Sequence, residues 1–135
     1  YVLTDKISYR VRPPQKGEVI VFKAPKNIGK DYIKRIIGKP GEKVKIQDGR
    51  IFINDQILDE NYLPSDIKTL PSSYIKESIE YEVPQDSFFV LGDNRTNSSD
   101  SREWGFVKRN EIIGRSFLIY WPPQSFKLVK PGKFF

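Results

Sequence analysis

Short apolar runs rich in β-branched and aromatic residues recur along the chain and predict strands. Gly and Pro residues, which interrupt regular structure, separate most of these runs. The runs occupy residues 17–23, 32–37, 87–91 and 112–121. We find almost none of the 3.6-residue periodicity of an amphipathic helix, so a mainly-β chain is predicted.

Two pairs of turn residues predict β-hairpins between further apolar segments. Asp48-Gly49 separates residues 43–47 from residues 50–54, and Asp-Gly is one of the strongest short hairpin signals. Asn54-Asp55 separates residues 51–53 from residues 56–58 in the same way. Six or more strands with so little helical pattern predict an all-β, mainly antiparallel, barrel-like fold.

Residues 59–86 break this rhythm. They contain three prolines and only short apolar pieces, and residues 51–87 hold 8 Asp or Glu against 2 Lys or Arg. We therefore expect an inserted irregular lobe at 59–86, with few contacts and high mobility. Residues 1–58 and 87–135 are expected to form the β core.

Charge and composition narrow the possible functions. The net charge of +6 is concentrated in residues 1–50, which hold 13 Lys or Arg against 5 Asp or Glu. These charges alternate with strand-forming residues and form no block, so nucleic-acid binding is not predicted. The chain has no Cys and no His, which excludes disulfides, the usual zinc sites, Cys nucleophiles and a Ser-His-Asp triad. We predict no metal and no cofactor, and a general base would have to be Lys, a carboxylate or Tyr.

Lys34 is the first candidate for such a base. Side chains alternate along a strand, so Lys34 shares one face with Tyr32 and Ile36, while Arg35 points to the other. On an inner face Lys34 would be desolvated, its pKa would fall, and it could act as a base near neutral pH. The strand pattern alone favours the other interpretation, in which Lys34 snorkels from an edge strand.

The segment Gly92–Gly105 concentrates polar residues directly after a predicted buried strand. It holds three types of charged side chain, two amides and several hydroxyls. Catalytic groups are often held on loops that a rigid scaffold fixes. A polar network that only stabilises a long turn would use the same residues, and both interpretations can hold together.

The ordered motifs of the chain resemble type I signal peptidase, a family of Ser-Lys proteases with a mainly-β fold. The resemblance rests on Tyr32-Ile33-Lys34-Arg35-Ile36-Ile37-Gly38-Lys39-Pro40-Gly41, on Gly92-Asp93-Asn94-Arg95 and on Asn97-Ser98, Asp100-Ser101-Arg102 and Trp104-Gly105. It covers about Lys6 to Trp121 apart from the lobe. Lys39, where the family more often has Leu, lies in a turn and is expected to matter little.

The resemblance implies a role for each matching residue. Lys34 would be the general base, oriented by Ser98. Arg35 would pair with Asp93, and Asp100 with Arg102, while Asn94 belongs to the same supporting motif. Val21 and Ile33 would line shallow pockets for small substrate residues, and an extended substrate would add as a strand beside Asp31–Ile33.

The family's nucleophile pattern, Ser-Met-x-Pro-Thr-Leu, is absent from the chain. Because Tyr1–Lys6 resembles the segment that follows this pattern, we expect the serine and a membrane anchor upstream of Tyr1, and we expect no cleavage by this piece alone. Ser8, Ser72, Ser73 and Ser78 lack the flanking pattern.

The resemblance further implies substrates, partners and a location. The substrates would be signal peptides of exported preproteins, and the domain would contact a membrane surface. It would lie on the extracytoplasmic side of that membrane, in the periplasm or the thylakoid lumen. The stretch 5–14 is similar to cyanobacterial and plastid members. The aromatic residues at 120–121, 126 and 134–135 would suit a membrane interface, or terminal packing.

Two alternatives remain. One is a self-cleaving SOS-repressor type Ser-Lys protease, against which stand the Gly92–Gly105 motif and the lack of a helix-turn-helix segment. The other is a noncatalytic β module that binds peptides or nucleic acid, in which Lys34 and the loop are purely structural. The sequence says nothing of the oligomeric state.

Overall fold

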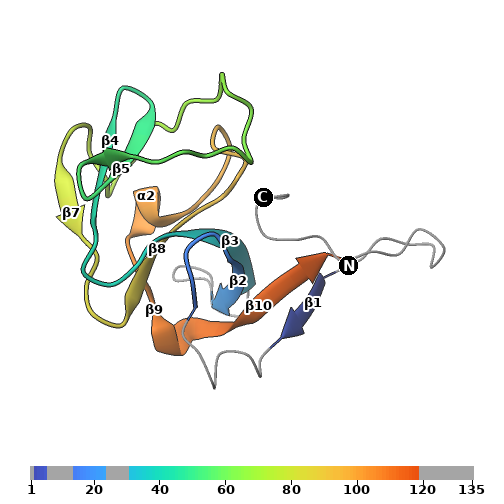
Figure 1. Ribbon diagram of the computed structural model, residues 1–135. Coiled ribbons are helices and arrows are strands. Elements are labelled where there is room, and N and C mark those ends of the chain that lie inside the picture. The colour runs from blue at the N-terminus through green and yellow to red at the C-terminus, as the bar shows by residue number, and fades with distance from the viewer. Residues whose placement is uncertain (1, 6–13, 24–30, 119–135) are drawn as a thin grey trace.

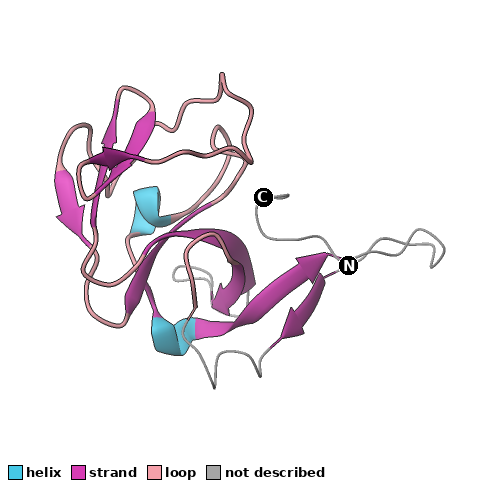
Figure 2. Cartoon of the chain, viewed as in Figure 1, coloured by secondary structure: helices cyan, strands magenta, loops and turns pink. Residues whose placement is uncertain are grey.

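A computed structural model describes residues 2–5, 14–23 and 31–118 of the chain, and within 2–5 and 115–118 only the backbone (Figure 1). In this part of the chain the strands form two sheets, and the only helical pieces are α2 (Ser101–Trp104) and the 3₁₀ turn η1 (Arg109–Glu111) (Figure 2). The prediction of an all-β, mainly antiparallel fold is confirmed.

The first sheet has six antiparallel strands in the order β1-β10-β2-β3-β8-β9. These are β1 (Val2–Asp5), β10 (Ile112–Leu118), β2 (Val19–Lys23), β3 (Asp31–Gly38), β8 (Ser87–Leu91) and β9 (Val107–Lys108). Lys34 of β3 lies opposite Ile20 of β2, and Arg35 lies opposite Val19. β3 is thus an interior strand, and β8 joins it only from Arg35 to Gly38.

The second sheet has four strands in the order β6-β5-β4-β7. These are β6 (Gln56–Ile57), β5 (Arg50–Ile53), β4 (Lys43–Gln47) and β7 (Glu80–Glu82). Both predicted hairpins are present, and their turns have positive φ angles of 53° at Asp48, 76° at Gly49, 50° at Asn54 and 68° at Asp55. These values match the type I′ turns that suit two-residue hairpins.

Two apolar cores flank β3 and β8. Ile37, Phe89 and Leu91 pack with the second sheet in one core. Ile36, Phe88 and Val90, on the opposite faces of the same strands, pack with Ile20 and Phe22 of β2 in the other. The alternation of side chains therefore decides which core each β3 residue enters. It places Lys34 on the same face as Ile36, beside the core that contains Ile20 and Phe22.

The irregular segment 59–86 is tied to the second sheet. It supplies β7, which pairs with β4, and it buries Ile75 and Val83 completely in the core of that sheet. The expectation of few contacts is therefore wrong for these residues. The four-stranded sheet contains strands from both sides of residue 59. The division of the chain into a β core and a lobe at that position therefore stays a prediction.

Two sequence-based expectations fall partly or wholly outside the described residues. The predicted strand 112–121 is present as Ile112–Leu118, and the aromatic residues from 120 onward are not described.

Within residues 2–5, 14–23 and 31–118, no helix has the length and apolar character needed to cross a bilayer.

Candidate active site

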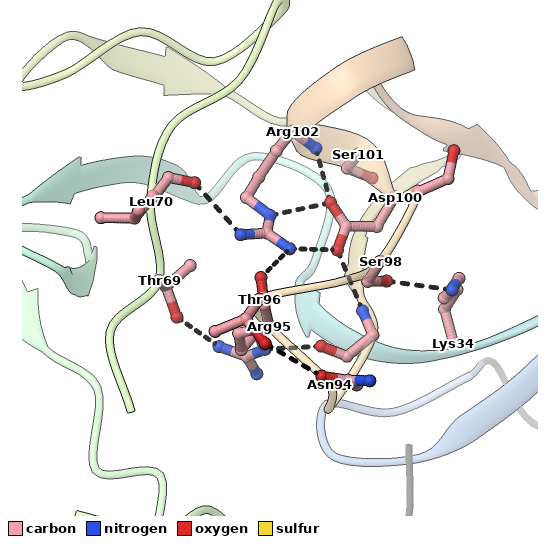
Figure 3. A network of polar contacts seen from close by, with 12 residues as sticks. Lys34, Thr69, Leu70, Asn94, Arg95, Thr96, Ser98, Asp100, Ser101 and Arg102 are labelled. Atoms are coloured by element: carbon pink, nitrogen blue, oxygen red, sulfur yellow. Dashed lines mark hydrogen bonds and ion pairs between the residues drawn. The ribbon is translucent and has the colours of Figure 1, made fainter. Parts of the chain in front are cut away.

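Lys34 meets Ser98 where β3 lies beside the loop that follows β8. The Lys34 amine donates a hydrogen bond of 3.0 Å to the Ser98 hydroxyl (Figure 3). Its nitrogen also lies 5.5 Å from the centre of the Tyr32 ring. Burial lowers the pKa of Lys34 from its ordinary 10.5, against the opposing charge of Asp100. A lysine desolvated in this way can lose its proton more readily than a lysine that snorkels into solvent.

Arg35 leaves the opposite face of β3 and is fully buried. It donates two hydrogen bonds to the Asp93 carboxylate, of 2.9 Å and 2.5 Å, and a third of 2.8 Å to the Gly17 carbonyl. Burial raises the pKa of the Asp93 carboxyl above 3.8, while the hydrogen bonds and charge of Arg35 oppose that rise. This two-point ion pair fixes the start of the loop against β3.

Asp100 and Arg102 form a second buried ion pair at the far end of the loop (Figure 3). Arg102 donates to both Asp100 oxygens, at 2.9 Å and 2.8 Å. Asp100 also accepts a hydrogen bond from the Gly92 N–H at 3.1 Å and caps α2 by accepting from the Arg102 N–H at 3.1 Å. The carboxylate thereby joins both ends of the loop.

Gly92 lies directly against the Lys34–Ser98 pair. A Cβ atom placed on Gly92 would be 2.0 Å from the Ser98 Oγ and 3.2 Å from the Lys34 Nζ. Real Cβ atoms essentially never approach another heavy atom to less than 3.0 Å. Glycine is therefore the residue that allows the backbone to pass so close to the pair.

Arg95 is a central residue of the loop to which we assigned no role from the sequence. It is 3% exposed and donates to the Gly92 carbonyl at 2.7 Å and to the Thr69 hydroxyl at 2.9 Å. It also forms an ion pair with Glu60. The position of Arg95 in the polar motif was a signal, but nothing in the sequence of residues 59–86 pointed to its partners.

Ser101 and Trp104 were likewise not predicted individually. The Ser101 hydroxyl, fully buried, accepts a hydrogen bond of 2.9 Å from the Val90 N–H of β8. The Trp104 indole donates to Ser99 at 3.0 Å, and its ring packs on Tyr32 with centroids 6.2 Å apart. Ser101 thus attaches α2 to β8, and Trp104 packs α2 on β3, the strand that carries the candidate base.

The remaining predicted residues lie around this centre. Asn94 is exposed and its side chain accepts from Thr96 at 3.2 Å, so it contributes to a local turn. Asp31 is exposed at the start of β3. Val21 is buried opposite half-buried Ile33 on the neighbouring strand. The roles assigned to these residues stay predictions.

The described residues offer general-base chemistry more than metal chemistry. Within residues 2–5, 14–23 and 31–118, no group of three or more acidic, Cys or His side chains is placed to hold a metal ion. What the centre contains is a lysine with a lowered pKa, hydrogen-bonded to a hydroxyl and held by two buried ion pairs. Such a lysine can accept a proton from a nucleophile and return it to a leaving group.

Comparison with known proteins supports the resemblance. The family described as signal peptidase, peptidase S26, matches residues 1–121. The probable signal peptidase I-2 of Synechocystis sp. is 44% identical over 126 residues, which cover 90% of this chain and 55% of that protein. Thylakoidal processing peptidase 1 of Arabidopsis thaliana is 36% identical, over 92% of this chain and 37% of its own length. The chain thus spans about half or less of these two relatives.

A solved structure shares the fold. The crystal structure of a signal peptidase I from Enterococcus faecalis aligns with a TM-score of 0.62 at 33% sequence identity, covering 76% of this chain and 95% of that one. The family match extends over the Lys34 strand, the Gly92–Gly105 loop and both sheets. By sequence and by fold, the chain belongs to the signal peptidase family, peptidase S26.

Proposed function

We propose that this chain is the catalytic domain of a membrane-associated serine endopeptidase that cleaves signal peptides from exported preproteins. The observation that carries the proposal is the hydrogen bond between the Lys34 amine and the Ser98 hydroxyl, together with the burial that lowers the pKa of Lys34. Membership of the signal peptidase family supports the substrate class.

In this mechanism neutral Lys34 is the general base. It takes the proton from the attacking serine as that oxygen bonds to the scissile carbonyl carbon. The protonated amine then gives this proton to the leaving nitrogen as the peptide bond breaks. The same lysine then takes a proton from water as that water bonds to the acyl carbon, and it returns this proton to the serine oxygen as the ester bond breaks. The attacking serine belongs to the family pattern Ser-Met-x-Pro-Thr-Leu, which this chain does not contain, and Ser98 orients the lysine.

The substrate is proposed to extend the first sheet beside Asp31 and Ile33. The N–H and C=O of Ile36 bond toward the β2 side, and alternation then turns those of Asp31 and Ile33 toward the β8 side. Among the described residues, β8 pairs with β3 only from Arg35 onward, so the backbone groups of Asp31 and Ile33 on that side have no strand partner there and could pair with an added strand. Val21 and Ile33, opposite each other in register, would restrict nearby substrate side chains to small ones.

The decisive experiment replaces Lys34 in a longer protein that contains this chain together with the serine pattern. Lys34→Ala should lower kcat/KM on a signal-peptide substrate by about 10²-fold or more, the usual contribution of a general base. Lys45→Ala is the matched control, because Lys45 is also a half-buried strand lysine packed over an aromatic ring, at 5.0 Å from Phe52. Wild-type cleavage by the Lys34→Ala protein would contradict the proposal.

The location of the domain is also proposed. We place it at the membrane surface on the extracytoplasmic side, in keeping with the thylakoidal name of one relative. Flotation of the chain with liposomes of neutral and anionic lipid should show association with the bilayer. Association with neither kind of liposome would argue against a membrane-binding surface on this domain.

A further inference from the structure

Two residues of the irregular segment contact two arginines of the site, Arg95 in the Gly92–Gly105 loop and Arg35 on β3. The Glu60 carboxylate accepts a hydrogen bond of 2.9 Å from Arg95 and forms a second contact with the same guanidinium. The Tyr62 hydroxyl donates to Glu60 at 2.6 Å. The Tyr62 ring also lies 4.3 Å from the centre of the Arg35 guanidinium. Glu60 and Tyr62 thus connect Arg95 of the loop with Arg35 of β3.

Arg95 transmits this contact to the two ends of the loop. Its side chain holds the Gly92 carbonyl at 2.7 Å, and its own carbonyl accepts a hydrogen bond of 3.0 Å from Arg102. A buried guanidinium that loses its counter-ion is strongly unfavourable, and its surroundings must rearrange or admit water. Removing Glu60 would therefore loosen Arg95 and weaken its contacts with Gly92 and Arg102, which would then be held chiefly by Asp100.

Gly92 in turn determines the space available to the Lys34–Ser98 pair. Its N–H donates to Asp100 at 3.1 Å, and a Cβ atom added to it would meet the Ser98 hydroxyl at 2.0 Å and the Lys34 amine at 3.2 Å. A small displacement of Gly92 changes both the hydrogen bond of the pair and the access of water to the amine.

We propose that Glu60 and Tyr62 are positioning residues for the Lys34–Ser98 pair, acting through Arg95 and Gly92. The segment that supplies them is therefore a working part of the site. The inference concerns the chemistry of Lys34 and rests on the proposed role of that residue as a base. Its test reads the lysine directly, without peptide cleavage.

The sign of the expected change separates positioning from simple electrostatics. The charged and titratable groups that act on the Lys34 amine are Asp100, Tyr32, Arg102 and Asp93. Removing the negative charge of Glu60 can only lower the pKa of a nearby lysine or leave it unchanged. Loosening the loop admits water to the amine, reverses its desolvation and raises the pKa toward 10.5. A rise therefore reports positioning.

The experiment is an NMR titration of the Lys34 side chain in the 135-residue chain and its variants. Glu60→Gln should raise the pKa of Lys34 toward 10.5, so that a smaller fraction of the amine is deprotonated at a given pH. Tyr62→Phe, which removes only the hydroxyl, should raise it by a smaller amount. Glu42→Gln is the matched control, because Glu42 forms an ion pair with Lys16 and its side chain is 14% exposed, as is that of Glu60.

Each result decides the question. A higher pKa of Lys34 in Glu60→Gln and Tyr62→Phe, with the wild-type value in Glu42→Gln, supports the inference. An unchanged or lower pKa of Lys34 in folded Glu60→Gln overturns it. If Glu60→Gln does not fold, the pKa of Lys34 in Tyr62→Phe decides the question by the same criterion. If the wild-type longer protein cleaves no signal peptide, the proposed function fails, while the titration still measures the positioning effect.

Discussion

Replacing Gly92 by alanine tests whether the close approach of the loop backbone sets the geometry of the candidate site. Gly92 is not among the described residues with a positive φ, so alanine can adopt its backbone conformation. The perturbation is purely steric. The added Cβ would stand 2.0 Å from the Ser98 Oγ and 2.8 Å from the Ser98 Cβ.

The magnitude follows from these distances. Ordinary contact begins at 3.4 Å, so Ser98 must move by roughly 1 Å or more, which breaks its 3.0 Å hydrogen bond with Lys34. Overpacking of this kind costs about 1–3 kcal/mol of unfolding free energy. A displacement of about 1 Å in a catalytic group can lower the rate by about 10²-fold. We therefore expect a modest loss of stability and a large loss of cleavage.

The assay combines urea unfolding of the chain with signal-peptide cleavage by the longer protein. Gly38→Ala is the control, because its Cβ would meet Phe89 and Val44 at 3.1 Å in the core of the second sheet. Gly38→Ala should also lose stability through overpacking, with smaller shifts of its neighbours, and should keep its kcat/KM when measured well below its melting temperature. A Gly92→Ala protein with wild-type kcat/KM would refute the reasoning.

Three further substitutions test the electrostatics and hydrogen bonding of the site. Because burial lowers the pKa of Lys34 below 10.5, the native state binds fewer protons than the unfolded chain. Lys34→Met should therefore be more stable than wild type at pH 7, with the difference in urea-unfolding free energy shrinking as the pH rises toward 10.5. Asp100→Asn, which breaks a buried ion pair, should cost about 3–5 kcal/mol, and Asp55→Asn, in an exposed pair, less than about 1 kcal/mol. Ser101→Ala leaves a buried backbone N–H without its acceptor and should cost about 1–3 kcal/mol in thermal unfolding, whereas exposed Ser73→Ala should change little.

Local patterns predicted the parts of the fold that depend on neighbouring residues. Asp48-Gly49 specified its hairpin because few residues tolerate the positive φ angles that this turn requires. Alternation along β3 separated Lys34 from Arg35 because successive side chains must leave a strand on opposite faces.

Contacts between segments far apart in the sequence could not be predicted in the same way where a segment lacks the hydrophobic periodicity of a strand or a helix. The Arg95–Glu60 pair joins residues 35 positions apart, and one partner lies in a stretch with neither strand nor helix pattern. β7 is only three residues long, so its alternation of exposed Glu80 and Glu82 with half-buried Tyr81 is too short to mark a strand in an irregular segment. The close approach of Gly92 to Ser98 is equally invisible, since a glycine in a polar loop usually signals a turn alone.

The 64-residue separation between Lys34 and Ser98 has a consequence for the order of folding. Closing a flexible loop of that length costs about 4 kcal/mol of chain entropy before any contact forms. The hairpins of the second sheet lie inside this loop and can form first, since their contacts are local. Until β8 docks on β3, Lys34 remains hydrated and protonated like any surface lysine. A newly made chain therefore acquires the lowered pKa of Lys34 only after β8 and the loop that follows it have docked on β3.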